Sequence, residues 1–273
     1  MKRLELGIVS DEISLNFEEA FRYANAWGIR LFELRNLLSG RVPFVEASEI
    51  RSIESILKNE DVQVTAISPG LFKAPMSQRK VLDADLRENL PRALELAERL
   101  DVKKVILFGF LLETGKQPSK YFKCCEYLQI ASEMAADYGC EILVENEHGF
   151  LCDSGSNTAR MLIEIDMPNL KVNWDPCNAY LCDEALSTGY ERVKFLLGNV
   201  HVKDTRAGSH VECVPVGEGA IDWKGQLRAI MEDEMIGHVT IETHCHPLVE
   251  QSKKNVDTIR RLQDEIESEF IMG

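Results

Sequence analysis

The sequence predicts an α/β fold, a single-domain (β/α)8 TIM barrel that spans residues 1–273. The first observation is that eight short apolar runs alternate with eight stretches of helical periodicity, a pattern that requires parallel strands joined by crossover helices. The second is the length of 273 residues, which fits eight such units in a closed barrel. The third is that polar residues gather where the apolar runs end, as they do at the working rim of such barrels.

An open, doubly wound sheet is the alternative arrangement. Such sheets bind dinucleotides through a Gly-x-Gly-x-x-Gly turn after the first strand, and this sequence has no such turn there. No Pro-, Gly- or Ser-rich linker, composition shift or low-complexity segment divides the chain. The closed barrel is therefore the better fit, and one domain is expected.

The first half of the chain supplies four units of strand and helix. The first helix is expected to begin after Asn16, which can cap a helix start, and to end at Gly28, which favours the turn after a helix. The dipeptide Pro69-Gly70 ends the third strand. The expected strands are residues 4–9, 29–34, 62–68 and 102–108, and the expected helices are residues 17–27, 46–58, 83–100 and 119–138.

The second half supplies four more units, and each of its strands ends at or beside a side chain that can bind a metal ion. Asp175 follows an apolar run and precedes Pro176, so it should stand where the chain turns out of the sheet. Glu145, His201 and Glu242 hold similar positions in the other three strands. The expected strands are residues 142–145, 172–175, 200–202 and 239–242, and the expected helices are residues 158–164, 184–197, 223–231 and 248–270.

These four side chains are expected to converge on one divalent metal ion, because the carboxyl ends of barrel strands meet at one rim. Two glutamates, one aspartate and one histidine form a mostly oxygen donor set, which suits Mn²⁺, Mg²⁺, Co²⁺ or Zn²⁺. Bound there, the ion would polarise a substrate carbonyl and stabilise an enediolate. The predicted metal ligands are Glu145, Asp175, His201 and Glu242.

Glu145 and Glu242 are also the expected catalytic acid and base. They belong to the fifth and the eighth predicted strands, so in a closed barrel they approach the centre from opposite sides. One glutamate could remove a proton from one face of a carbon atom, and the other could return it to the opposite face or to the neighbouring carbon. The predicted result is epimerisation or isomerisation.

Six short motifs carry a resemblance that covers essentially the whole chain. They are Val144-Glu145-Asn146, Asn173-Trp174-Asp175-Pro176-Cys177-Asn178, His201-Val202-Lys203-Asp204, Gly217-Glu218-Gly219, Ile221-Asp222-Trp223 and Ile241-Glu242-Thr243. The sequence resembles the xylose-isomerase-like TIM-barrel superfamily, in the branch of sugar (phosphate) isomerases and epimerases. The resemblance implies a divalent-metal-dependent sugar or polyol isomerase or epimerase, with the two glutamates as its acid and base pair.

The sequence departs from the pattern of the ketose epimerases at the substrate site. These enzymes usually have a histidine three residues after the strand-six aspartate, where this chain has Asn178. They also tend to have an arginine shortly after the strand-seven histidine, and the arginine that follows His201 in this chain is Arg206. The asparagine counts against a free ketohexose as substrate.

Residues close to the predicted ligands are expected to bind substrate. Lys203 lies two positions after His201 and would point to the same side of a strand, although an ion pair with Asp204 is the alternative. The histidines that follow the two glutamates, and the glutamate of the Gly-Glu-Gly turn, could equally be loop residues without a role. The expected substrate-binding residues are Lys203, Arg206, His148, Asn178, Glu218 and His244.

Other rim residues bear on the kind of substrate. Arg35, Lys73 and Arg206 are candidates to bind an anionic group, but no phosphate-binding loop accompanies them, so phosphorylation of the substrate is left open. Phe108 and Phe110 could stack on a sugar face. Trp174 alternates with Asp175 along its strand, and we therefore expect its ring to point into the core.

The main alternative function is a metal-dependent dehydratase of the inosose or dehydroshikimate type, since the same stabilised enolate can expel a hydroxyl group as water. A DNA-repair endonuclease would need additional histidines on the second and third strands, and residues 29–34 and 62–68 end near none. A non-catalytic binding protein is least favoured because the full set of metal ligands is present.

Composition limits the partners. With 45 acidic and 31 basic residues, the formal charge of -14 opposes binding to nucleic acid or to anionic membrane surfaces, so a small sugar or polyol is the expected partner. The eight cysteines form no Cys-x-x-Cys pair, so free thiols are expected. Neither a signal peptide nor a membrane span is recognised in the sequence, so a cytoplasmic location is expected. A homo-oligomer is left open, since the last helix could pack on its own barrel or on another subunit.

Overall fold

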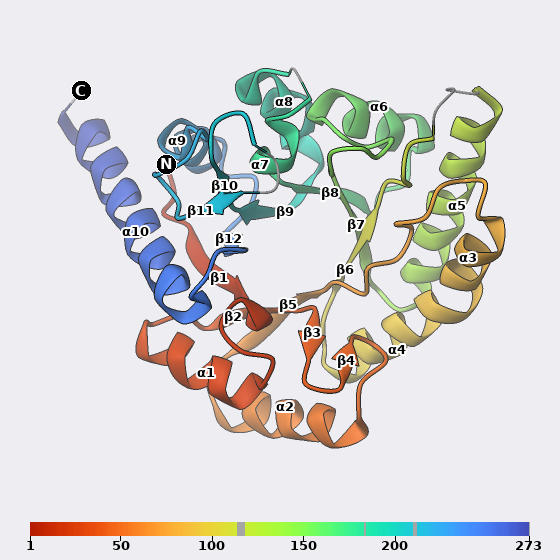
Figure 1. Cartoon of the computed structure of the whole chain (residues 1–273), viewed down its shortest axis with the longest axis horizontal. Helices are drawn as coiled ribbons and strands as arrows, with labels where there is room; N and C mark the ends of the chain where they lie inside the picture. The colour runs from red at the N-terminus through yellow and green to blue at the C-terminus, as the bar shows by residue number, and fades with distance from the viewer. Residues whose placement is uncertain (114–117, 183, 210–211, 273) are drawn as a thin grey trace.

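The computed structural model describes residues 1–113, 118–182, 184–209 and 212–272. Eight parallel strands close into a barrel in the order β1-β12-β9-β8-β7-β6-β5-β2, surrounded by helices (Figure 1). The prediction of a single-domain TIM barrel is confirmed. The barrel strands are β1 (Glu5–Val9), β2 (Leu31–Leu34), β5 (Gln63–Ile67), β6 (Lys104–Phe108), β7 (Glu141–Glu145), β8 (Leu170–Trp174), β9 (Leu197–Val202) and β12 (His238–Ile241).

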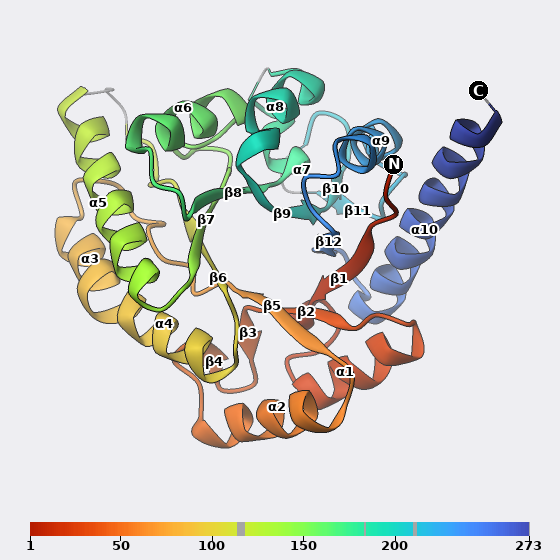
Figure 2. The same ribbon diagram turned by 180° about the vertical axis from the view of Figure 1, so that it is seen from behind.

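Helices cover the outside of the barrel on all sides, as the view from behind also shows (Figure 2). The Asn16 side chain accepts a hydrogen bond from the amide of Glu19 at 3.2 Å, which confirms the expected cap of the first helix. The helices are α1 (Phe17–Ala26), α2 (Ala47–Asn59), α3 (Arg79–Ala84), α4 (Leu90–Arg99), α5 (Pro118–Asp137), α6 (Gly155–Ile165), α7 (Pro176–Ala179), α8 (Leu186–Val193), α9 (Trp223–Asp233) and α10 (Leu248–Met272).

The helix expected over residues 83–100 begins earlier and is interrupted. A π-helical turn, Asp85–Asn89, separates α3 from α4. Pro91 explains this interruption, because it lacks the amide that would bond to the carbonyl group of Arg87, and its ring would clash with that group.

The boundary between the seventh strand and the helix before it also differs from the prediction. Helix α8 ends at Val193, a 3₁₀ turn follows, and Leu197 already belongs to β9, where it pairs with Val172 of β8. The apolar run Phe195-Leu196-Leu197 fits a helix and a buried strand equally well, so periodicity alone could not place the boundary.

Two small hairpins follow barrel strands at the end of the barrel where the site lies. One joins β3 (Asn36–Leu37) to β4 (Gly40–Arg41), and the other joins β10 (Asp204–Thr205) to β11 (Cys213–Val214). Strands of two residues give no periodic signal, and neither hairpin was predicted. The carboxylate of Asp204 accepts hydrogen bonds from the amides of Thr205, Gly217, Gly219 and Ile221, which fixes the loop around the second hairpin.

The core separates apolar from polar side chains by strand alternation. Trp174 is fully buried, and its indole donates a hydrogen bond to Oε1 of Gln226 on α9 at 3.1 Å, so its predicted place in the core is confirmed. Ile259 and Ile266 of α10 are buried, whereas Phe270 near the end of the helix is 64% exposed. No disulfide joins any of the eight cysteines. No helix in the described part of the chain is both long and apolar enough to cross a membrane.

Candidate active site

Four buried side chains converge at the carboxyl ends of neighbouring strands. Glu145 ends β7, Asp175 follows β8, His201 lies near the end of β9, and Glu242 follows β12. One ligand atom from each residue lies within 4.8 Å of the others. The structure thus brings together all four residues that the sequence singled out as metal ligands.

The turn after β8 is fixed by reciprocal hydrogen bonds to the end of β7. The amide of Asp175 donates to Oδ1 of Asn146, and Nδ2 of Asn146 donates to the Asp175 carbonyl oxygen, both at 2.8 Å. Oδ1 of Asp175 accepts a bond from the Asn178 amide at 3.0 Å and so caps α7, with Pro176 in the first turn. These bonds hold Glu145 and Asp175 beside each other.

The imidazole of His201 lies between carboxylates from three strands. Its Nε2 lies 2.9 Å from Oε2 of Glu33 on β2, and its Nδ1 lies 3.5 Å from Glu242 and 3.7 Å from Glu145. Burial disfavours the charged ring, but these carboxylates outweigh burial and raise the His201 pKa well above its ordinary value. Glu33 was not among the predicted site residues, and its position inside the apolar run Phe32-Glu33-Leu34 was the available signal.

Lys203 is buried and pairs with two of the predicted ligands. Its Nζ lies 2.8 Å from Oδ2 of Asp175 and 2.9 Å from Oε2 of Glu242. Burial opposes its charge, but the two carboxylates more than compensate and raise its pKa. The alternative ion pair with Asp204 is not formed, because Asp204 binds backbone amides instead.

A second group of charges surrounds Arg35, which follows β2. Its guanidinium contacts Asp11 at 3.0 Å, Glu12 at 2.5 Å and Glu242 at 2.6 Å. His244 contacts Glu12 at 2.5 Å and Glu242 at 3.4 Å. Glu12, Glu242 and His244 also lie close enough to one another to hold an ion, but this group shares Glu242 with the four predicted ligands and adds only two residues to it.

The predicted substrate-binding residues divide into two groups. Lys203, Asn178 and His244 line a pocket of about 340 Å³ that Glu145 and Glu242 also line, and Nδ2 of Asn178 lies 3.3 Å from Oε1 of Glu145. The other three are exposed and do not line this pocket, so their role in substrate binding stays a prediction. Arg206 pairs with Glu212 at the end of the second hairpin, Glu218 pairs with Lys254, and His148 lies near the sulfur of Cys182.

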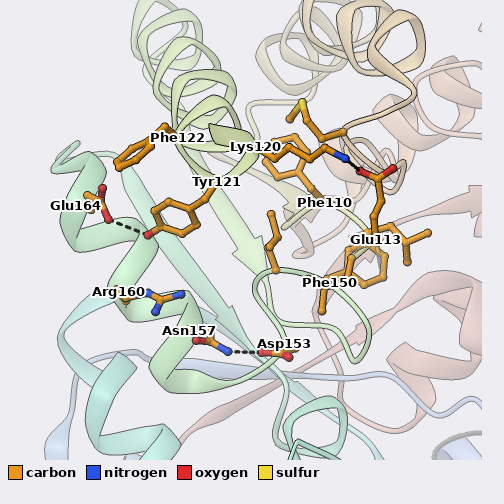
Figure 3. A pocket seen from close by; sticks show the side chains of 14 residues that line it. Phe110, Glu113, Lys120, Tyr121, Phe122, Phe150, Asp153, Asn157, Arg160 and Glu164 are labelled. Atoms are coloured by element: carbon orange, nitrogen blue, oxygen red, sulfur yellow. Dashed lines mark hydrogen bonds and ion pairs between the residues drawn. The ribbon is translucent and has the colours of Figure 1, made fainter. Parts of the chain in front are cut away.

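Phe108 and Phe110, the two phenylalanines that were expected to stack on a sugar, line different cavities. Phe108 lines the site pocket, where Nζ of Lys73 lies 3.7 Å from its ring centroid. Phe110 instead lines a separate cavity of about 380 Å³, whose lining also includes Tyr121 and Arg160 (Figure 3). Phe150 also lines that cavity, and its ring lies 6.0 Å from the Phe108 ring, so these two rings stand between the cavities.

The ligand set fits a divalent cation. Carboxylate oxygens and an imidazole nitrogen are common ligands of Zn²⁺ and Mn²⁺. Because Nε2 of His201 is engaged by Glu33, Nδ1 is the nitrogen that faces Glu145 and Glu242. The residues that would hold the ion are Glu145, Asp175, His201 and Glu242.

Comparison with solved structures shows the same fold in many enzymes. L-Ribulose 3-epimerase superposes with a TM-score of 0.82 and 16% identity, over 99% of this chain and 98% of that one. The probable 3-DHS dehydratase AsbF from Bacillus anthracis gives 0.78 and 18%, over 94% and 99%. The IOLI protein, solved with a bound zinc atom, gives 0.79 and 14%, over 97% and 99%.

The identities to these structures are too low to transfer a function. A search of curated proteins found no significant match. The model of one protein family, the xylose isomerase-like TIM barrel, matches residues 21–264. The chain therefore belongs to the xylose isomerase-like TIM barrel family.

Proposed function

We propose that this protein is a divalent-metal-dependent sugar or polyol isomerase or epimerase. The observation that carries the proposal is the convergence of three carboxylates and one imidazole, all buried, within 4.8 Å of one another. Burial of so many acidic groups is costly unless cations compensate them. The likeness to L-ribulose 3-epimerase supports this reaction class at the level of the fold.

One divalent ion held by Glu145, Asp175, His201 and Glu242 would supply Lewis acidity to polarise a substrate carbonyl group. Mn²⁺, Mg²⁺, Co²⁺ and Zn²⁺ are the candidates that the ligand set accepts. The fold likeness to the IOLI protein, solved with a bound zinc atom, supports a metal-binding function.

Glu145 and Glu242 transfer the proton in this proposal. They project from β7 and β12, three positions apart in the closed ring of eight strands, and therefore approach the pocket from different sides. Burial raises the pKa of both, but neighbouring cations outweigh burial: His201 lowers the pKa of Glu145, and Lys203 with His244 lowers that of Glu242. Either ionised carboxylate can thus accept the proton that the substrate carbon loses, and the other glutamate has to be protonated when it returns one.

Lys203 and Arg35 stabilise the charge that develops on the substrate. Removal of a proton next to a carbonyl leaves negative charge on the substrate oxygens, and fixed cations in a water-poor pocket stabilise it strongly. Lys203 is buried, and both basic side chains line the pocket and contact Glu242. Asn178 also lines the pocket and can donate a hydrogen bond to a substrate hydroxyl.

The test is metal analysis of the purified protein, followed by solvent deuterium exchange into ketoses, hydroxypyruvate and inosose with the best divalent ion. About one metal per chain and carbon-bound deuterium in a substrate would support the proposal. The proposal fails if the protein takes up no metal. It also fails if the double variant Asp175→Ala/His201→Ala binds as much metal as the wild type.

A dehydratase is the second candidate. His244 contacts Glu242 at 3.4 Å and lines the pocket, so it could protonate a departing hydroxyl group after the first proton transfer. The fold likeness to the probable 3-DHS dehydratase AsbF supports this class. Product analysis separates the two functions: dehydration removes water and creates a conjugated product with new ultraviolet absorbance, whereas isomerisation leaves the composition unchanged.

A further inference from the structure

We infer that the substrate of this site carries a carboxylate group, and that Arg41 binds it. The inference rests on one part of the proposed function: that the pocket lined by Glu145 and Glu242 is the substrate site. Arg41 lies at the end of β4, in the first small hairpin, and it lines the same pocket as Glu145 and Glu242.

Arg41 differs from the other basic side chains of the pocket in its partners. Arg35 contacts three carboxylates, Lys203 contacts two, and Lys73 lies 3.1 Å from Glu147. His244 contacts two glutamates. Within the described ranges of the chain, Arg41 forms no ion pair, and its hydrogen bonds go to one uncharged residue.

That residue is Ser68, which follows β5. Nε of Arg41 donates to the Ser68 carbonyl oxygen at 2.9 Å, and its Nη2 lies 3.2 Å from the Ser68 hydroxyl. These bonds orient the plane of the guanidinium, while Nη1 donates to none of the residues that the structure describes. A fixed guanidinium with free N–H groups is suited to bind a carboxylate through parallel hydrogen bonds.

Gly70 makes room for this arrangement. Its φ of +76° is one that other residues rarely adopt, and a Cβ atom placed on it would lie 2.7 Å from Cζ and from Nε of Arg41. A side chain at position 70 would therefore push the guanidinium out of its place. The backbone of the loop after β5 thus accommodates a charged group that forms no direct ion pair with the residues described.

A neutral substrate would leave the guanidinium of Arg41 without an ion-pair partner in the pocket, although Asp11, Glu145 and Glu242 attract it from farther away. Burial, and after it the positive charge of Arg35, lowers the pKa of Arg41. A negative group bound beside Arg41 relieves both effects. Among anions, one unmatched guanidinium balances a single charge, which favours a carboxylate over a doubly charged phosphate. The substrate class is accordingly a sugar acid, with its carboxylate at Arg41 and its reacting carbon near Glu145 and Glu242.

Binding of unreactive probes tests this assignment without any need for turnover. D-Gluconate and D-glucitol differ in one terminal carbon, which is a carboxylate in the first and a hydroxymethyl group in the second. We expect calorimetry on the protein as purified to show gluconate binding about 10- to 100-fold more tightly, the usual worth of a charge-assisted hydrogen bond. In Arg41→Met this preference should disappear, and in Arg41→Lys it should recover in part.

Arg30→Met serves as the matched control. Arg30 precedes β2 at the other end of the barrel, where it pairs with Asp61, so its loss removes the same charge without touching the pocket. Any one of three outcomes would overturn the inference. They are equal binding of the two probes to the wild type, undetectable binding of gluconate, and a preference for gluconate that survives in Arg41→Met. Tighter binding of D-glucitol 6-phosphate than of gluconate, lost in Arg41→Met, would overturn the assignment to a carboxylate.

Turnover separates this inference from the proposed function. D-Fructose and D-fructuronate share the same carbonyl end and differ only at the sixth carbon. Deuterium exchange into fructuronate alone, with a KM raised in Arg41→Met and kcat little changed, would support both. Equal exchange into fructose would leave the proposed function intact and overturn the carboxylate assignment. Probe binding that depends on Arg41, without exchange into any substrate, would support the carboxylate assignment and count against the isomerase.

Discussion

Nε2 of His201 lies 2.9 Å from Oε2 of Glu33, and this contact joins β9 to β2 across the interior of the barrel. It sets the orientation of the imidazole, since the nitrogen that remains, Nδ1, faces Glu145 and Glu242. Carboxylates that hold the second nitrogen of a metal-binding histidine in this way fix its tautomer and increase its basicity.

Glu33→Gln should therefore weaken metal binding without removing a ligand. An amide can donate to Nε2 and so favour the proton on Nδ1, the nitrogen that the metal needs. We expect Mn²⁺ affinity, measured by calorimetry, to fall about 10- to 100-fold. Glu54→Gln is the control, because Glu54 pairs with Arg99 on the outside of the barrel. An unchanged affinity in Glu33→Gln would show that Glu33 does not position His201.

Glu145→Gln and Glu242→Gln should each abolish turnover while the fold persists. Glutamine keeps the shape of the side chain but cannot accept the proton, and loss of a general base costs about 10²- to 10⁴-fold in rate. Deuterium exchange into the substrate measures the effect, and circular dichroism checks the fold. Full activity in either variant would contradict the assignment of acid and base.

Lys203→Met should bind metal more tightly and turn over more slowly. The ammonium group shares oxygens of Asp175 and Glu242, which a metal ion must also bind. Removal of one partner from a buried ion pair costs about 3 to 5 kcal/mol, so the metal-free variant should melt at a lower temperature and be stabilised more by Mn²⁺. A Mn²⁺-induced rise in Tm no larger than that of the wild type would argue against this competition.

His238 should make the protein less stable in mild acid. Burial, followed by the charge of Lys104, lowers the pKa of His238 to about 4, against an ordinary value of 6.5. The unfolded chain therefore takes up a proton between these values and the folded chain does not, so stability is full above about pH 6.5 and falls towards pH 4. The loss reaches about 3 kcal/mol at most.

His238→Gln removes this titration. Urea unfolding at pH 7 and pH 4.5 should show a smaller loss of stability in the variant than in the wild type. The same difference in both proteins would mean that His238 is protonated in the folded state. Nε2 of His238 is buried and makes no hydrogen bond to the residues described.

The sequence by itself determined the barrel and the four predicted metal ligands. Both depend on local patterns: alternation of strands and helices sets the architecture, and polar residues that end apolar runs lie at the same rim of a parallel barrel. Glu145, Asp175, His201 and Glu242 each follow this rule within a few residues of chain. Trp174 could be assigned to the core for the same reason, since a strand alternates its side chains.

Only the tertiary structure decided what surrounds these ligands. Closure of the barrel sets β1 beside β12, and this brings Glu12 and Arg35 to Glu242, more than 200 residues away along the chain. Arg41 reaches the pocket through a hairpin too short to have a periodic signal, and Arg206 points to solvent from another. The directions of such loop residues depend on packing between distant segments, which a single sequence does not encode in any local pattern.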